Sequence, residues 1–178
     1  SLDSTAVTGT TSDLSTLTDL TELHFYGTAL SGSVSELGKL SKLQRLNVGS
    51  TQVTGDVSSL GQLTQLIYLS LESTAVTGTT SDLSTLTDLK ELHISSTALS
   101  GSVSELGKLS KLQRLNVGST AVTGTISSLS TLTDLTQLYI YSTALSGNVS
   151  ELGKLSKLTV LNVGSTQVTG DVSSLGQL

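Results

Sequence analysis

The sequence predicts a solenoid of the α/β class, with a parallel β-sheet on its concave face and short 3₁₀ or irregular turns on its convex face. Three observations predict it. Glycine returns every 23 residues, from Gly9 to Gly170, and a threonine stands four positions before each. Ahead of each later threonine the order is Leu-x-x-Leu-x-apolar, as in Leu43, Leu46 and Val48. Because so short a unit cannot bury its own apolar face, stacked copies must share one core.

Each unit reads as a strand, a bend and a return, in that order. Leu46-Asn47-Val48 alternates apolar and polar residues, which is typical of a half-buried strand. The periodic glycine follows Thr-x-Val-Thr and relaxes the backbone at the bend. Leucines then recur every three residues, as at Leu37 and Leu40. This spacing favours a 3₁₀ or irregular turn, so we expect little true helix.

Residues 1–178 are expected to form a single solenoid of about eight 23-residue repeats, counted from the periodic glycines. Neither the opening nor the closing segment has the polar capping unit that solenoids usually need, so we expect a stretch of a longer array. A longer period is superimposed, because Ser4–Leu20 recurs unchanged as Ser73–Leu89, and Thr28–Thr51 as Thr97–Thr120. This identity indicates recent duplication of a three-unit block, or deliberate copying by a designer.

The composition excludes several classes of function. The chain has 178 residues, a net charge of −5 and no cysteine, so disulfides, thiolate nucleophiles and cysteine-bound metals are excluded. Its mild acidity comes without a basic stripe, which argues against nucleic acid as a partner. No apolar run approaches the roughly 20 residues of a membrane span.

The repeat resembles the leucine-rich repeat family. The motif Leu-x-x-Leu-x-Leu-x-x-Asn-x-Leu is matched from Leu20 to Leu30, with Phe25 at the third apolar position and Thr28 at the asparagine position. The tail that runs to Val34 looks like the Leu-x-Gly-x-Ile extension of plant-type repeats, and Thr-x-Val-Thr-Gly looks like repeats of some protist surface antigens. The resemblance covers the whole chain. It implies a solenoid that presents its concave sheet to a partner, in an extracellular or cell-surface setting.

Two departures from the plant-type pattern matter. The unit is one residue shorter, and Ser35 stands where that pattern carries proline. Threonine also replaces asparagine throughout, so one hydroxyl replaces a two-donor amide. We expect the inner ladder of hydrogen bonds to be shorter, or shared with backbone and water. The threonines of this structural ladder are Thr5, Thr28, Thr51, Thr74, Thr97, Thr120, Thr143 and Thr166.

Strand residues between the leucines should point out of the concave face, because side chains alternate along a strand. All four tyrosines, both histidines and both arginines of the chain fall at these positions. Tyrosine and arginine are favoured as interface anchors, which predicts partner binding; the alternative is that aromatic residues simply suit an exposed sheet. The predicted partner-binding residues are Glu22, His24, Tyr26, Arg45, Asn47, Tyr68, Ser70, Glu72, Glu91, His93, Arg114, Asn116, Gln137, Tyr139 and Tyr141.

Specific contacts can be expected on this face. Neighbouring strands lie about 4.8 Å apart, so Glu22 should face Arg45, and Glu91 should face Arg114, as cross-strand ion pairs. Glycines in the outermost column should leave shallow gaps that a partner's side chain or a sugar could fill, beside a tyrosine. These glycines are Gly49, Gly118 and Gly164, and the tyrosines are Tyr26 and Tyr141.

Catalysis is not predicted. Ser70 and His93, with Glu72 and Glu91 nearby, form only a loose nucleophile–base–acid set. An open sheet provides neither an oxyanion hole nor a cleft that excludes water. No metal or other cofactor is predicted, since the two histidines should lie three strands apart. Asn148 begins an Asn-Val-Ser sequon, a possible glycosylation site if the chain is secreted.

The favoured function is therefore a non-catalytic scaffold that binds a protein, peptide or glycan at its concave sheet. The alternative is a structural repeat protein, a filament or cell-surface coat subunit that stacks through open solenoid ends. A designed consensus-like scaffold also stays open. Ice binding is a lesser alternative, because hydroxyls form an evenly spaced rank at the bends. Its threonines are Thr8, Thr54, Thr77, Thr123 and Thr169.

Overall fold

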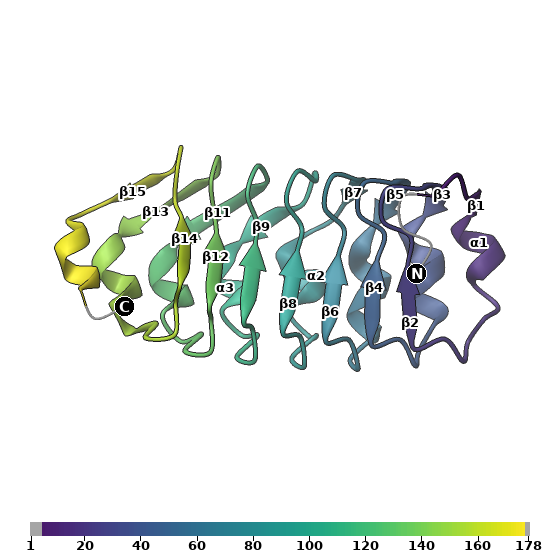
Figure 1. Ribbon diagram of the computed structural model, residues 1–178, viewed down its shortest axis with the longest axis horizontal. Helices are drawn as coiled ribbons and strands as arrows, with labels where there is room; N and C mark the ends of the chain where they lie inside the picture. The colour runs from purple at the N-terminus through teal and green to yellow at the C-terminus, as the bar shows by residue number, and fades with distance from the viewer. Residues whose placement is uncertain (1–4, 177–178) are drawn as a thin grey trace.

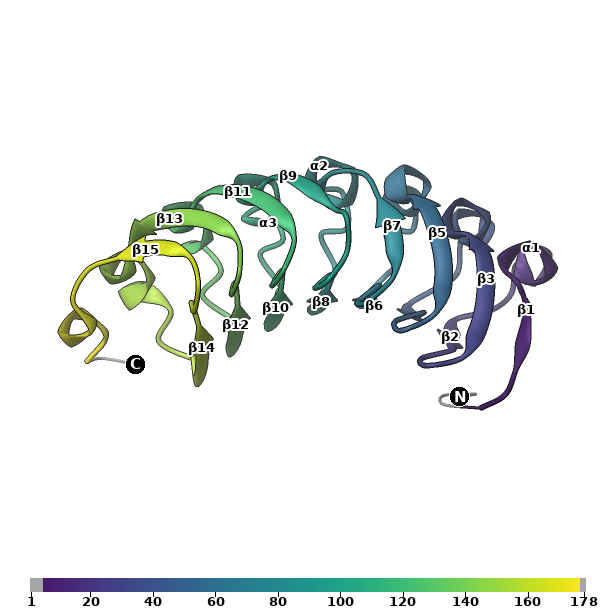
Figure 2. The same ribbon diagram turned by 90° about the horizontal axis from the view of Figure 1, so that it is seen from above.

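The computed structural model describes residues 5–176 as a curved stack of coils (Figures 1 and 2). A parallel sheet lines the inner side of the arc, and short helices lie along its outer side (Figure 2). The expected α/β solenoid with a concave parallel sheet and short convex turns is confirmed.

The concave sheet has seven parallel strands within residues 5–176, in the order β14-β12-β10-β8-β6-β4-β2. The central leucine of a strand points inward and its two neighbours point outward, as Leu46 is buried between the half-buried Arg45 and Asn47. Pairing keeps equivalent positions of successive coils opposite one another. The strands are β2 (Glu22–His24), β4 (Arg45–Asn47), β6 (Tyr68–Ser70), β8 (Glu91–His93), β10 (Arg114–Asn116), β12 (Gln137–Tyr139) and β14 (Val160–Asn162).

A second tier of strands, not predicted from the sequence, follows the concave strand in each coil. Over the described residues these strands form two parallel sheets of four, which we call the flanking sheets. A single bridge between Thr79 and Ser100 lies where the two meet. One flanking sheet contains β1 (Thr8–Thr10), β3 (Ala29–Ser33), β5 (Gln52–Asp56) and β7 (Ala75–Thr77); the other contains β9 (Ser100–Ser102), β11 (Ala121–Thr125), β13 (Ala144–Asn148) and β15 (Gln167–Thr169).

The return of each coil is a single short helix. A side chain at the N-cap often satisfies the free backbone N–H groups, as where Ser58 N–H donates to the carboxylate of Asp56 at 2.8 Å. The one-turn α-helices are α1 (Thr11–Leu14), α2 (Thr80–Leu83) and α3 (Val103–Leu106). The 3₁₀ helices are η1 (Val34–Lys39), η2 (Val57–Gln62), η3 (Ile126–Leu129), η4 (Val149–Lys154) and η5 (Val172–Leu175).

The shared interior is a column of leucines, valines and isoleucines, most of them completely buried. The periodic glycines have φ between +91° and +137°, a range that L side chains rarely adopt. This explains why glycine recurs at this position in every coil. None of the helices in the described part of the chain has the length and apolar character of a membrane span.

The ladder threonines bond within their own coils. The hydroxyl of Thr97, for example, donates to the carbonyl of Ile94 at 2.7 Å. From Thr28 to Thr166, seven such bonds of 2.5–2.8 Å recur in the described chain. The residue before the threonine turns left-handed: Gly27 has φ 68°, and its counterparts in the next six coils are serines with φ of 52–55°.

Candidate functional site: the concave sheet

The pairing register carries the predicted side chains across the sheet in rows. In the first row Glu22 lies opposite Arg45, Arg45 opposite Tyr68, and Tyr68 opposite Glu91. The same row continues through Arg114 and Gln137. The second row runs from His24 to Tyr139. The third row lies two residues further along each coil than the second row, with one buried residue between them. It holds Tyr26, Glu72 and Tyr141.

The middle of this face holds five side chains in serial contact, which we call the central cluster. The guanidinium carbon of Arg45 lies 4.7 Å from the centre of the Tyr68 ring. That ring lies 5.7 Å from the ring of His93, tilted by 41°. Nε2 of His93 is 3.6 Å from the carboxylate of Glu91, which accepts a 3.2 Å hydrogen bond from Arg114. The cluster therefore spans strands β4 to β10.

One of the two expected ion pairs forms and the other does not. Glu91 pairs with Arg114, but the carboxylate of Glu22 lies 3.6 Å from Nε2 of His24 instead of bonding Arg45. The correction has a physical reason. Arg45 has the face of Tyr68 as an alternative partner on the following strand, and a cation over an aromatic ring is attracted by its negative face.

The expected gaps at the glycines are already filled by the chain's own tyrosines. A Cβ at Gly118 would stand 2.3 Å from the Tyr141 ring, and one at Gly49 would stand 3.1 Å from the Tyr26 ring. Each ring thus lies over the glycine of the preceding or following strand. The expectation of open gaps is wrong at these two positions. At Gly164 the nearest atom to such a Cβ is the side-chain oxygen of Asn162, at 3.3 Å.

Three predicted contact residues have structural roles. Ser70 is only 2% exposed, so its expected presentation on the surface is wrong. It is enclosed because its side-chain oxygen packs close to Gly49 of the neighbouring coil. The side-chain oxygens of Asn47 and Asn116 accept hydrogen bonds from the backbone N–H groups of Gly49 and Gly118, at 3.2 and 3.1 Å. These asparagines fix the backbone where the strand ends.

Burial raises the pKa of the Tyr68 hydroxyl above its ordinary value of 10.0. A hydrogen bond with Ser70 opposes the shift, while the nearby carboxylates of Glu91 and Glu72 add to it and Arg45 opposes it. The phenol therefore stays neutral at physiological pH. It can then both donate and accept hydrogen bonds at the surface.

The remaining predicted positions are distributed as follows. Tyr139 and Gln137 are half-buried on the same face. Asn148 is exposed at the N-cap of η4, where its side chain accepts a hydrogen bond from Ser150 N–H. Among the side-chain hydrogen bonds of residues 5–176, none joins Ser70 to His93. No group of three or more metal-binding side chains gathers in that part of the chain.

Sequence reasoning found these positions but not the contact between the rings of Tyr68 and His93. The two residues lie on adjacent strands in different rows, so they are diagonal neighbours. Diagonal neighbours in a sheet are within reach of aromatic side chains. The predicted register together with this rule could have indicated the contact between Tyr68 and His93.

A family model described as a leucine-rich repeat region matches residues 50–175. No curated protein matches the chain by sequence search. Among solved structures, the ectodomain of the plant membrane receptor kinase GASSHO1/SCHENGEN3 from Arabidopsis thaliana, in complex with CASPARIAN STRIP INTEGRITY FACTOR 2, is 33% identical with a TM-score of 0.87. That match covers 98% of this chain and 22% of the ectodomain chain.

Two further structures are similar. The ectodomain of the Arabidopsis receptor kinase HAESA, in complex with an N-terminally extended IDA peptide hormone ligand, is 27% identical with a TM-score of 0.87, over 97% of this chain and 31% of that one. Internalin C2 from Listeria monocytogenes is 27% identical with a TM-score of 0.80, over 100% of this chain and 75% of that one. The present chain thus spans less than a third of either plant ectodomain.

Proposed function

The chain belongs to the leucine-rich repeat family, and from this premise we propose that it is a non-catalytic binding protein whose concave sheet holds an extended peptide or a peptide segment of a protein. One observation carries the proposal, namely the central cluster on the exposed side of the sheet. Tyrosine and arginine dominate interface hot spots. Because the cluster's side chains already contact one another, a partner that binds there removes little of their freedom.

A peptide fits the face better than a neutral glycan. Charges of both signs, at Arg45, Glu91 and Arg114, lie on either side of the rings of Tyr68 and His93. Such a row complements a segment that carries charged and aromatic side chains of its own. Two similar ectodomains were crystallised with the partners named above, one of which is a peptide hormone. Those partners support the class of ligand proposed for this chain, not its identity.

We place this activity outside the cell or on its surface. The similar plant proteins are ectodomains of membrane receptor kinases. The sequon at Asn148 is exposed, as a glycan-bearing asparagine must be. Expression through a eukaryotic secretory pathway should add a glycan mass that is lost in the Asn148→Gln variant.

A displayed library of random linear peptides, selected on the whole chain, tests the binding proposal. Enriched peptides should lose about 10-fold or more in affinity for the Tyr68→Ala and Arg45→Ala variants, as expected for hot-spot residues. Lys39→Ala on the convex side is the matched control, since the ammonium of Lys39 pairs with Glu36 there, at 2.6 Å, away from the concave sheet. Its affinity should equal that of the unmodified chain.

Two results would contradict the proposal. Peptides that bind the Tyr68→Ala and Arg45→Ala variants as tightly as the original chain would move the binding site away from the central cluster. A library that yields no saturable binder would remove extended peptides as the ligand class. Equal urea midpoints for all variants show that lost affinity is not lost folding.

A further inference from the structure

The concave sheet presents the same four residue types at two places, which we call the first and the second quartet. The first quartet, on β2 and β4, consists of Glu22, His24, Arg45 and Asn47. The second quartet, on β8 and β10, consists of Glu91, His93, Arg114 and Asn116. In both, the pairing register sets the glutamate opposite the arginine and the histidine opposite the asparagine.

Much of the local geometry is shared as well. In each quartet Nε2 of the histidine lies 3.6 Å from the glutamate carboxylate. The arginines differ, because Arg45 lies over the ring of Tyr68 whereas Arg114 donates to Glu91 at 3.2 Å. The side chains of Glu22 and Arg114 are 59% and 47% exposed, so a ligand can reach them. Each quartet thus places a carboxylate and a guanidinium on neighbouring strands of the exposed face.

The coil between the two quartets differs from its own copy. Residues 66–73 lie between the quartets, and residues 135–142 are their counterpart 69 positions later. The inward positions stay apolar in both segments, but the three outward residues of the rows are all different. They change from Tyr68, Ser70 and Glu72 to Gln137, Tyr139 and Tyr141. The apolar interior therefore does not dictate the outward residues, and the face consists of two equal quartets with Tyr68 between them.

The opposite charges within a quartet complement a neutral side chain that both donates and accepts hydrogen bonds. A ligand carboxylate would be attracted by the arginine and repelled by the glutamate, and an ammonium group would experience the reverse. A carboxamide has an acceptor oxygen and an NH₂ group with two donors. Across strands about 4.8 Å apart, its oxygen can accept from the guanidinium while its nitrogen donates to the carboxylate. Asparagine and glutamine are the side chains that fit.

The distance between the quartets matches the repeat of an extended peptide. Strands β2, β4, β6, β8 and β10 stand side by side in this order (Figure 1). The quartets are therefore three strands apart, or about 14 Å at the usual strand spacing. Four residues of an extended chain cover about 13–14 Å, and side chains four apart point to the same side. A peptide that crosses the strands brings side chains i and i+4 to the two quartets, and side chain i+2 to Tyr68 on β6.

We propose that the ligand of the concave sheet is a peptide segment with asparagine or glutamine at two positions four residues apart, and that each quartet binds one of the two amides. The proposal rests on the peptide-binding function proposed above and specifies the pattern that the ligand carries. The guanidinium groups of Arg45 and Arg114 donate to the amide oxygens. The carboxylates of Glu22 and Glu91 accept from the amide nitrogens.

The peptides enriched by selection on the whole chain test the spacing. Their alignment should show asparagine or glutamine at two positions four apart. Replacing either amide residue by alanine should lower the affinity about 10-fold or more, because hydrogen bonds to charged groups are lost. Inserting one glycine between the two amides should have a similar effect, since one of them then faces away from the sheet. A glycine added at the end of the peptide is the matched control and should leave the affinity unchanged.

Double-mutant cycles assign each amide to its quartet. Arg45→Ala should weaken binding of the original peptide, but it should not further weaken the peptide in which one particular amide has been replaced by alanine. Arg114→Ala should show the same non-additivity with the other amide. The direction of the peptide across the sheet follows from which amide couples to which arginine.

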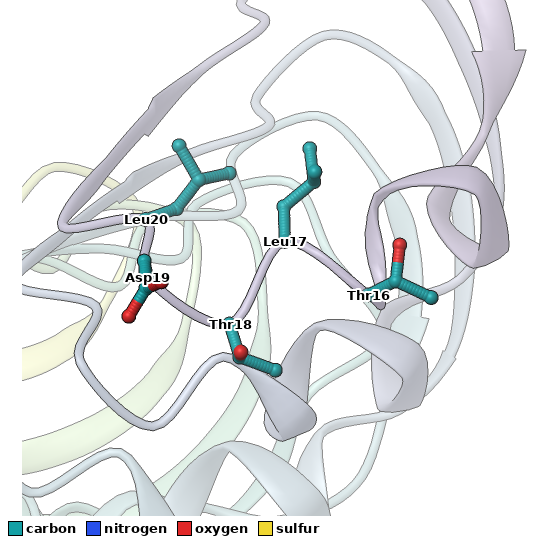
Figure 3. A pocket seen from close by; sticks show the side chains of 5 residues that line it. All are labelled: Thr16, Leu17, Thr18, Asp19 and Leu20. Carbon is teal, nitrogen blue, oxygen red and sulfur yellow. The ribbon is translucent and has the colours of Figure 1, made fainter.

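Two lysines on the same coils provide the control variants. Lys42 and Lys111 each stand three residues before a quartet arginine and donate to Asp19 and Asp88, outside the strands of the sheet. Asp19 points away from the leucines of the hollow that Thr16–Leu20 lines, ahead of β2 (Figure 3). Lys42→Ala and Lys111→Ala remove a cation of the same sign and should leave the affinity unchanged.

The proposal is overturned if the enriched peptides lack the paired amides, if the inserted glycine leaves the affinity unchanged, or if both amides couple to the same arginine. Peptides that lose affinity for Tyr68→Ala but show any of these results leave the binding function intact and remove only the paired-amide pattern. Peptides that no variant of the concave sheet weakens remove both. Equal urea midpoints for all variants show that the losses are not losses of folding.

Discussion

Each ladder threonine holds its own coil closed. From Thr28 to Thr166 its hydroxyl donates to the carbonyl three residues earlier, and in several coils it also accepts the N–H two residues later, as from Leu99 to Thr97 at 3.4 Å. Thr97 is buried, so the Ile94 carbonyl depends on this hydroxyl rather than on water. A buried polar group left without a partner is costly.

Replacing Thr97 by valine should lower the free energy of unfolding by about 1–3 kcal/mol, because it leaves that carbonyl unsatisfied at nearly constant volume. Thr97→Ser keeps the hydroxyl and should recover much of the loss. Urea unfolding measures both. Thr54→Val, on an exposed strand position, is the control and should change stability by no more than about 0.5 kcal/mol. Equal stability of Thr97→Val and Thr97→Ser would contradict this role.

The sequence placed the concave residues correctly in rows, because a fixed period fixes register. It did not reveal their contacts. Arg45 contacts Tyr68 rather than Glu22, and the Tyr141 ring lies over Gly118. Each side chain has possible partners on both neighbouring strands, and the register alone does not determine which one it contacts. Such choices depend on side-chain rotamers, which a repeat pattern does not contain.

The aspartates at the N-termini of the short helices make the stability of the fold depend on pH. Asp56 accepts the N–H of Ser58, and Asp13 accepts both the N–H and the hydroxyl of Thr10. The backbone hydrogen bond from Ser58 is the largest cause that lowers the pKa of Asp56, and the Thr10 hydroxyl is the largest for Asp13. Both carboxylates favour the folded state when ionised.

Stability should therefore fall in acid. A carboxyl whose pKa is lower in the folded chain stabilises it above the unfolded value of about 3.9, and this stabilisation disappears as the pH falls through the folded value. Asp56→Asn keeps an acceptor that does not titrate. The stability difference between Asp56→Asn and the original chain, measured in urea, should therefore change between pH 7 and pH 3. A difference that is constant with pH would show that the carboxylate charge contributes nothing.

Sequence reasoning anticipated the short 3₁₀ returns but not the flanking sheets. The spacing of leucines by three indicated the turns directly. The second strand of a coil can be as short as Ala75–Thr77, and the glycine that follows it predicts a bend at this place rather than a strand. Its exposed–buried–exposed order, with Val76 inward, is the alternation of a strand. Three residues carry too little of that pattern to be recognised without the neighbouring coil.

Across the whole molecule, stability should depend on position in the stack. Each coil contacts its two neighbours, so a central coil is supported on both sides and an end coil on one. Leu92 in the middle is completely buried, whereas Leu161 near the C-terminal end is only partly buried. The same residue type is thus present in two environments.

Leu92→Ala should cost about 2–5 kcal/mol, as expected for a large cavity in a packed core. Leu161→Ala should cost less, because its side chain buries less surface. Urea unfolding measures both, and hydrogen exchange should show the end coils opening before the coils around β8. Equal costs, or uniform exchange protection along the stack, would contradict nearest-neighbour stabilisation.

The left-handed serines that precede the ladder threonines have a practical consequence. A residue with a Cβ is about 1–2 kcal/mol less favourable in this conformation, and Gly27 shows that the same bend accepts a residue without one. Replacing Ser73, Ser96 or Ser119 at these bends by glycine or asparagine should therefore raise the thermal stability of the protein. Such changes would leave the leucine interior, the tyrosine-bearing face and both terminal coils in their original form.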